Sequence, residues 1–168
     1  MSALPSGAPD AIPSQDQTHQ RMHDLLTAVT TAVLEEQPGL LDFRDHRPQR
    51  DRSSGDSWRG LQTMCHVSAL LVSTGAPTGS ESATGQLLGV ADGVATSQGM
   101  HRRSERAGAG MTTASWTSAA GDLLEIVVGV RVAVRAISAP FLPGSLTPMA
   151  TTSPSSALSP LTPPRLVR

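Results

Sequence analysis

Two histidines in this sequence, His19 and His23, have the spacing of a metal-binding pair. They stand four residues apart in a segment with helical periodicity, so their imidazole rings would share one helix face. A zinc-protease motif also requires a glutamate directly after the first histidine, and that position holds Gln20. Because no spacing ties further ligands to the pair, we expect solvent-exposed histidines, no metal and no cofactor. If a metal site exists, its remaining ligands would come from Cys65 and His66, or from Asp24, His46 and His101.

Other patterns that resemble catalytic motifs lack the partners that the chemistry needs. The Gly-Asp-Ser segment at residues 55–57 resembles the start of a GDS-type hydrolase block, but a nucleophilic serine requires a histidine base, and no histidine follows His101. The carboxylates of Asp122 and Glu125 are interpreted as the polar entry to a strand rather than an acid–base pair. The sequence contains no lysine, which excludes a Walker A phosphate loop and a Schiff-base enzyme. We therefore expect no enzymatic activity.

The carboxyl-terminal segment contains a motif that could bind a protein partner. Pro160, Pro163 and Arg165 fit the pattern P-x-x-P-x-R, which presents the prolines of a polyproline II helix to an aromatic groove. This spacing is similar to that of an SH3 ligand. Arginines also gather in residues 44–52 and 102–106, but no aromatic residue is interleaved with them and the net charge is −1, so we do not expect nucleic-acid binding.

The elements that must position these residues begin with an amphipathic helix over residues 14–36. Ser14 and Gln17 have the spacing of a capping box, in which each residue satisfies a free backbone N–H at the start of a helix. Pro38 and Gly39 end the helical pattern, because the residue before a proline avoids the helical conformation. The apolar side chains with helical spacing are Met22, Leu25, Leu26, Val29 and Val33.

Residues 121–137 carry the clearest strand pattern. Val128, Val130, Val132 and Val134 alternate with glycine, alanine and arginine, and successive side chains of a strand point to opposite faces. The sequence therefore predicts one strand with a valine face at the centre of the core, covered by the amino-terminal helix. The same valine-rich strand is a second candidate surface for a protein partner.

The segments between the helix and the valine strand give weaker predictions. The charge alternation of residues 44–52 is typical of a solvated loop. Residues 58–72 are apolar and favour a second helix, which Gly75 would end. Asp-Gly at residues 92–93 lies between short apolar runs and predicts a two-residue hairpin turn. Residues 98–111 are rich in glycine and arginine and predict a mobile basic loop.

The composition favours a small folded region with extended ends. Of the 168 residues, 38% are hydrophobic and 2% aromatic, so the core must be thin and aliphatic. The sequence predicts a disordered leader over residues 1–13, one small α+β region over 14–138 with two helices at most and a few strands, and a disordered tail over 139–168. The single cysteine, Cys65, and the lack of a signal-peptide pattern or a long apolar run favour a cytoplasmic protein without a membrane span.

Three interpretations of function remain open from the sequence. The first is a small non-catalytic protein that interacts with another protein, and the agreement of the capping box with the apolar patterns favours it. The second is a fragmentary reading frame with little stable fold, because the absence of lysine, asparagine and tyrosine is typical of high-GC coding. The third is a cryptic metal-binding protein that uses His19 and His23.

Overall fold

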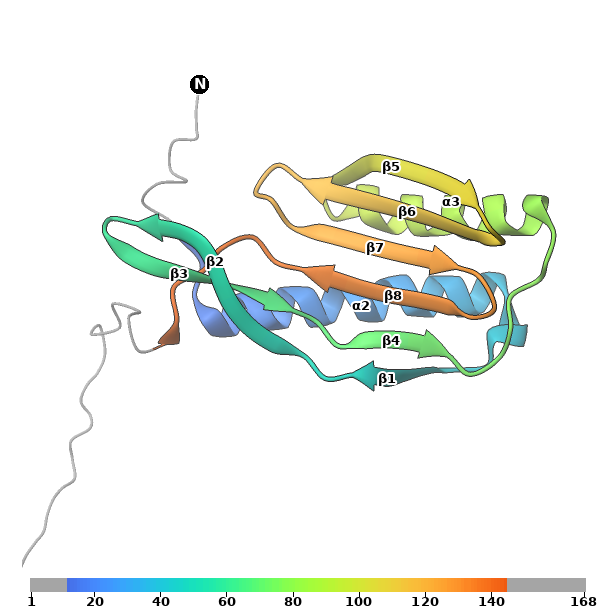
Figure 1. The fold of residues 1–168 in the computed structure, drawn as a ribbon, viewed down its shortest axis with the longest axis horizontal. Coiled ribbons are helices and arrows are strands. Elements are labelled where there is room, and N and C mark those ends of the chain that lie inside the picture. The colour runs from blue at the N-terminus through green and yellow to red at the C-terminus, as the bar shows by residue number, and fades with distance from the viewer. Residues whose placement is uncertain (1–11, 145–168) are drawn as a thin grey trace, which may run out of the picture.

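Two helices pack on one face of an eight-stranded antiparallel sheet (Figure 1). The structure is a computed structural model and describes residues 12–144. This architecture confirms the predicted α+β class. The elements in chain order are α2 Gln15–Glu36, the short 3-10 helix η1 Pro38–Leu40, β1 Phe43–Arg47, β2 Arg50–Trp58, β3 Leu61–Val67, β4 Leu70–Ser73, α3 Glu81–Ser97, β5 Met100–Gly108, β6 Met111–Ser118, β7 Leu123–Val128 and β8 Val132–Ile137.

The strand order places β8 at the centre of the sheet. The main path runs β1-β4-β8-β7-β6-β5, and the β2–β3 hairpin joins it through β3, where Val67 pairs with Ile137 of β8. The hairpin extends past the end of β8 and lies beside the start of α2 (Figure 1). This position brings side chains of β2 and β3 next to the first turns of the helix, where the candidate site lies.

The amino-terminal helix forms as the capping box predicts. The Ser14 hydroxyl accepts a hydrogen bond from the Gln17 backbone N–H at 3.1 Å, and the Gln17 side-chain oxygen accepts one from the Ser14 N–H at 3.0 Å. The helix ends at Glu36, two residues before Pro38. Its apolar face is buried, and the buried residues are Thr18, Met22, Leu25, Leu26, Val29 and Val33.

The valine segment forms a hairpin of two strands, so the prediction of one strand was wrong. Val128 of β7 pairs with Val132 of β8 across a tight turn, and residues paired in this way point to the same face of the sheet. Val128, Val132 and Val134 are therefore buried together in one cluster with the α2 side chains, as the predicted helix cover requires. Val130 lies in the turn and is 82% exposed, so it is the only one of the four valines that solvent reaches freely.

The two basic segments predicted as loops are strands. Residues 44–52 lie largely in β1 and β2, and residues 98–111 contain β5. These strands lie at the edges of the sheet, and in β5 only Met100 is buried. An edge strand that solvent reaches on both faces can carry charges at every position, so it shows no hydrophobic alternation. Charge density therefore concealed these strands from sequence analysis.

Two central segments have a different secondary structure from the one predicted. Residues 58–72, predicted as a helix, lie mainly in β3 and β4. These strands are held by pairing, β3 with β2 and β4 with β1. The Asp-Gly pair at residues 92–93, predicted as a turn, lies within α3. Ser80 caps that helix by accepting a hydrogen bond from the Ala83 N–H at 3.0 Å. The buried residues of α3 follow a helical spacing and are Leu87, Leu88, Ala91 and Ala95.

The first residues of the predicted tail belong to the packed part of the protein. Ala139, Phe141 and Leu142 are at most 6% exposed, and the Phe141 backbone exchanges two hydrogen bonds with Met64 of β3. The boundary at residue 139 was therefore placed too early. Residues 1–11 of the predicted leader and 145–168 of the tail, including Pro160, Pro163 and Arg165, lie outside the described residues.

No helix among residues 12–144 has the length and apolar character that a membrane crossing requires.

Candidate metal centre

Three side chains from three different elements meet at the start of α2. Asp51 Oδ1 lies 2.7 Å from His66 Nδ1 and 3.0 Å from His19 Nε2, and Asp51 Oδ2 also lies 3.0 Å from His19 Nε2. The two imidazole rings are tilted by 41° relative to each other, with their centroids 4.2 Å apart. The potential ligand atoms of all three residues lie within 4.8 Å of one another. Two histidines and one carboxylate thus converge on one point.

The backbone of the β2–β3 hairpin sets two of these residues side by side. Asp51 and His66 are direct partners in the antiparallel register, so their side chains lie on the same face of the hairpin. The His66 main chain is held in turn by Ser138, whose hydroxyl accepts from the His66 N–H at 2.9 Å and whose N–H donates to the His66 carbonyl at 2.8 Å. The carboxylate and one imidazole are therefore fixed by strand pairing, and α2 supplies the other imidazole.

Solvent exposure increases across the cluster from His66 through Asp51 to His19. The side chain of His66 is 3% exposed, that of Asp51 17% and that of His19 35%. Burial acts to raise the pKa of the Asp51 carboxyl, but hydrogen bonds from His66, His19 and Gln15 and the charge of His19 outweigh it and hold this pKa below its usual value. The carboxylate is therefore ionised at neutral pH, as a metal ligand must be.

A second layer of contacts orients the carboxylate and the outer histidine. Gln15 Nε2 donates to Asp51 Oδ2 at 3.0 Å, while Gln15 Oε1 accepts from the Gly144 N–H at 2.7 Å. The His19 ring meets the edge of Phe141, with centroids 6.0 Å apart at 83°. The segment after β8 therefore closes over the cluster, and such outer contacts are what keep ligand side chains in place in metal sites.

The structure brings together only part of the ligand set that the sequence suggested. His19 and His66 meet, but His23 is exposed on α2 and stands outside the cluster of mutually close ligand atoms. Cys65 precedes His66 on β3, so its side chain points to the opposite face of the hairpin. Burial raises the pKa of the Cys65 thiol. The remaining candidates Asp24, His46 and His101 are all exposed and lie outside the cluster.

Asp51 is the residue that sequence analysis missed. It lies in the charged segment that predicts a loop, where nothing distinguishes it from the neighbouring acidic and basic residues. Its pairing with His66 spans 15 residues of chain and its contact with His19 spans 32. A sequence signal would have been available only from recognising residues 50–67 as one hairpin and deriving its register.

The other polar residues considered for chemistry have structural partners. Asp122 is 7% exposed and accepts two hydrogen bonds from the Arg21 guanidinium, at 2.9 and 3.0 Å, and one from the Ala139 N–H at 2.7 Å. Glu125 on β7 forms an ion pair with Arg135 on β8 at 2.7 Å. Residues 55–57 lie within β2. Asp122 and Glu125 therefore tie elements together in the fold.

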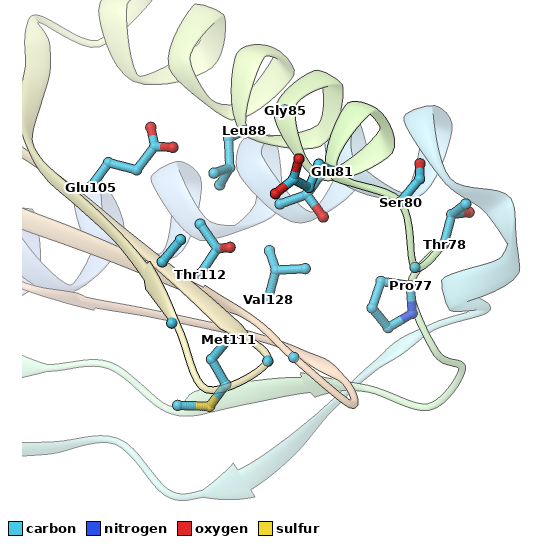
Figure 2. Close-up of a pocket in the computed structure, with 16 residues that line it drawn as sticks. Pro77, Thr78, Ser80, Glu81, Gly85, Leu88, Glu105, Met111, Thr112 and Val128 are labelled. Atoms are coloured by element: carbon cyan, nitrogen blue, oxygen red, sulfur yellow. The ribbon is translucent and has the colours of Figure 1, made fainter.

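Two of the cavities formed by residues 12–144 lie between a helix and the sheet. The larger, of about 630 Å³, opens between the start of α3 and the tips of the β5–β6 and β7–β8 hairpins (Figure 2). Figure 2 shows the carboxylates of Glu81 and Glu105 at this cavity, with Leu88 between them. Glu105 is already paired with Arg102. The smaller cavity, of about 440 Å³, lies between α2 and β1 and β4, and His66 is one of its lining residues.

Comparison with known proteins supports the fold and assigns no activity. No family model matches the chain, and no curated protein matches it in sequence. Its fold is similar to that of a solved structure, described as a DUF4853 family protein from Actinomyces odontolyticus ATCC 17982, with a TM-score of 0.53 and 17% sequence identity. The similarity covers 90% of this chain and 77% of that chain. At this level of identity it shows a shared α+β architecture.

Proposed function

We propose that the protein is a non-catalytic metal-binding protein that holds one late divalent transition metal ion between His19, Asp51 and His66. The observation that carries this proposal is the convergence of the two imidazole nitrogens on one carboxylate at 2.7 and 3.0 Å. Two nitrogens and one ionised oxygen are a ligand set that Zn²⁺ accepts. The proposal replaces the His19–His23 pair with ligands from three elements.

The spacing of the cluster supports a metal of ordinary bond lengths. Zinc binds histidine nitrogen and carboxylate oxygen at about 2.0–2.2 Å, so the ligand atoms of a tetrahedral site lie roughly 3.3 Å apart. The hydrogen-bonded atoms of His19, Asp51 and His66 are slightly closer than that. An entering ion would replace the shared protons and would lengthen these N···O distances by a few tenths of an ångström, and all potential ligand atoms already lie within 4.8 Å of one another.

The ligand set supports Zn²⁺, Ni²⁺ or Cu²⁺ over a hard cation. Imidazole suits these late metals, whereas Mg²⁺ and Ca²⁺ prefer a shell of oxygen ligands, and here one carboxylate supplies the oxygen. His66 is buried, and Gln15 already holds one carboxylate oxygen. The site thus offers three protein ligands, and a water molecule or another ligand can take the fourth position.

Calorimetric titration of the chelator-treated protein with Zn²⁺ tests the proposal. We expect one ion per chain in the wild type and loss of at least about tenfold in affinity in His66→Ala, because a lost ligand removes more than 1.4 kcal/mol of binding free energy. Since protons and the ion compete for the imidazoles, the affinity should also fall as the pH is lowered.

His23→Ala is the matched control, because His23 lies one turn from His19 on the same helix and outside the cluster. We expect it to bind Zn²⁺ like the wild type. Equal losses in His23→Ala and His66→Ala, or a wild type that takes up no ion, would refute the proposal and leave the cluster as a hydrogen-bonded clamp between α2 and the β2–β3 hairpin.

A further inference from the structure

The smaller cavity shares a wall with the candidate metal centre. Its volume of about 440 Å³ lies within the range of small-molecule sites. One wall comes from α2, and the other comes from the chain around β1, β3 and β4. His66 belongs to both places, because its Nδ1 faces Asp51 and the residue lines the cavity. A change at the metal centre therefore reaches the cavity through one side chain.

The second nitrogen of His66 has no hydrogen-bond partner among residues 12–144. Its Nδ1 is engaged by Asp51 at 2.7 Å, whereas its Nε2 has no such contact, although the residue is only 2% exposed. A buried polar nitrogen without a partner is costly, so protein interiors rarely leave one unsatisfied. The cavity is the space from which a partner for Nε2 can come.

A metal ion would decide what kind of partner Nε2 requires, and this step rests on the proposed function. An ion bound at Nδ1 places the remaining ring proton on Nε2, which then becomes a hydrogen-bond donor. Metal-bound histidines nearly always donate this N–H to a carboxylate, a carbonyl or water. No described residue accepts it here, so water or a molecule in the cavity would supply the acceptor.

The rest of the lining indicates the body of the molecule that would supply this acceptor. Met22, Leu26 and Leu71 offer apolar surface, while Thr27 adds a hydroxyl. Asp45 and His23 also line this cavity, and both are exposed. A short aliphatic chain with a carbonyl group at one end matches both the apolar surface and the donor.

We propose that this cavity binds a small acyl compound whose oxygen accepts a hydrogen bond from His66 Nε2 while a metal ion occupies Nδ1. The acceptor can be a neutral amide or a carboxylate, because both present an acyl oxygen. Binding of the ion and of the acyl compound is then coupled through one imidazole, and by linkage each increases the affinity for the other by the same factor.

Calorimetry with hexanamide and hexanoate, each with and without saturating Zn²⁺, tests the inference on the full chain. We expect at least one of them to bind, with an affinity about tenfold higher when Zn²⁺ is present. Binding of hexanamide alone would identify a neutral acyl ligand, and binding of hexanoate alone would identify a carboxylate. Hexylamine, which has the same chain and offers donors, should not bind.

Thr27→Phe fills the cavity from an exposed position of α2 without changing a metal ligand. We expect this variant to lose the acyl compound and to retain Zn²⁺, which also shows that it is folded. Thr31→Phe, one turn further along the same helix and outside the cavity lining, should retain both.

The outcomes separate this inference from the proposed function. Normal Zn²⁺ binding without binding of either acyl compound would overturn the inference and leave the metal site standing. Acyl binding that is independent of Zn²⁺, or that persists in Thr27→Phe, would overturn the coupling through His66. Failure of Zn²⁺ binding would refute the proposed function itself.

Discussion

Replacing Asp51 with alanine should destabilise the metal-free protein strongly for a residue so close to the surface. The carboxylate accepts hydrogen bonds from His66, His19 and Gln15, and these join α2 to the β2–β3 hairpin. Asp51→Ala removes all three at once. Most of the lost stability should come from the hydrogen bond to His66, because the His66 side chain is 3% exposed and cannot form a replacement hydrogen bond with water.

The size of the effect follows from the burial of each partner. A hydrogen bond to a charged group contributes about 1.5–3 kcal/mol, and the part-exposed His19 and Gln15 recover most of their share from water. We therefore expect Asp51→Ala to lower the free energy of unfolding by about 2–4 kcal/mol. With a slope of about 1–3 kcal/mol per molar urea, the urea midpoint should fall by roughly 0.7–4 M.

Urea unfolding in the presence of a chelator measures this difference, since bound metal would otherwise add to the stability of the wild type. Asp24→Ala is the matched control, because Asp24 is also on the surface and accepts a hydrogen bond from Gln20 at 2.9 Å in the same helix. It should change the free energy of unfolding by less than about 0.5 kcal/mol. An Asp51→Ala variant as stable as Asp24→Ala would show that the cluster does not hold α2 to the hairpin.

Three further predictions test the core, the titration of the cluster and the lone thiol. Leu124→Ala should lower the free energy of unfolding by about 2–5 kcal/mol, because Leu124 is fully buried between the sheet and the helices. Unfolding in urea should be a single cooperative transition. A broad, non-cooperative transition of the wild type would instead favour the interpretation of a reading frame with little stable fold. The pKa of Asp51 is lowered in the folded state, so its stabilisation is present above the usual carboxyl pKa of about 3.9 and is lost as the pH falls through the folded value. In urea titrations the stability gap between wild type and Asp51→Asn should therefore be full at about pH 5 and should narrow only below the usual carboxyl pKa. Partial burial raises the pKa of the Cys65 thiol, so iodoacetamide should alkylate it more slowly than glutathione at about pH 8, and a rate equal to that of glutathione would contradict the raised pKa.

The parts of the fold that could be predicted are those in which local pattern and tertiary packing agree. The helix at Gln15–Glu36 has its cap, its apolar face and its proline stop in sequence, and it forms as expected. The buried valine face was also predicted correctly, although its turn at residues 129–131 was missed. The turn escaped notice because pairing Val128 with Val132 keeps the alternation in phase on both strands.

The remaining elements depend on partners that are distant in sequence. The exposed strands β1, β2 and β5 are stabilised by backbone pairing to neighbouring strands, so their side chains carry no periodic signal. In α3, the residues of the Asp-Gly pair favour a turn in isolation, but Asp92 accepts a hydrogen bond from the Trp116 indole at 2.9 Å and faces Arg102. Tertiary contacts therefore override the local preference.

Sequence analysis named His19 and His66 among the candidate ligands but did not identify Asp51. The helical spacing of His19 and His23 suggested two ligands on α2, whereas the structure brings His19 together with Asp51 of β2 and His66 of β3. Strand register alone brings Asp51 beside His66, and no spacing along the chain reveals that register. The second histidine of the pair, His23, lies outside the cluster of mutually close ligand atoms.

Anomalous scattering from crystals grown with Zn²⁺ tests the central claim most directly. We predict one peak at the start of α2, about 2.0–2.2 Å from His19 Nε2, His66 Nδ1 and an Asp51 carboxylate oxygen. A map with no peak at these three residues, or with zinc only at exposed histidines such as His23 or His101, would contradict the account.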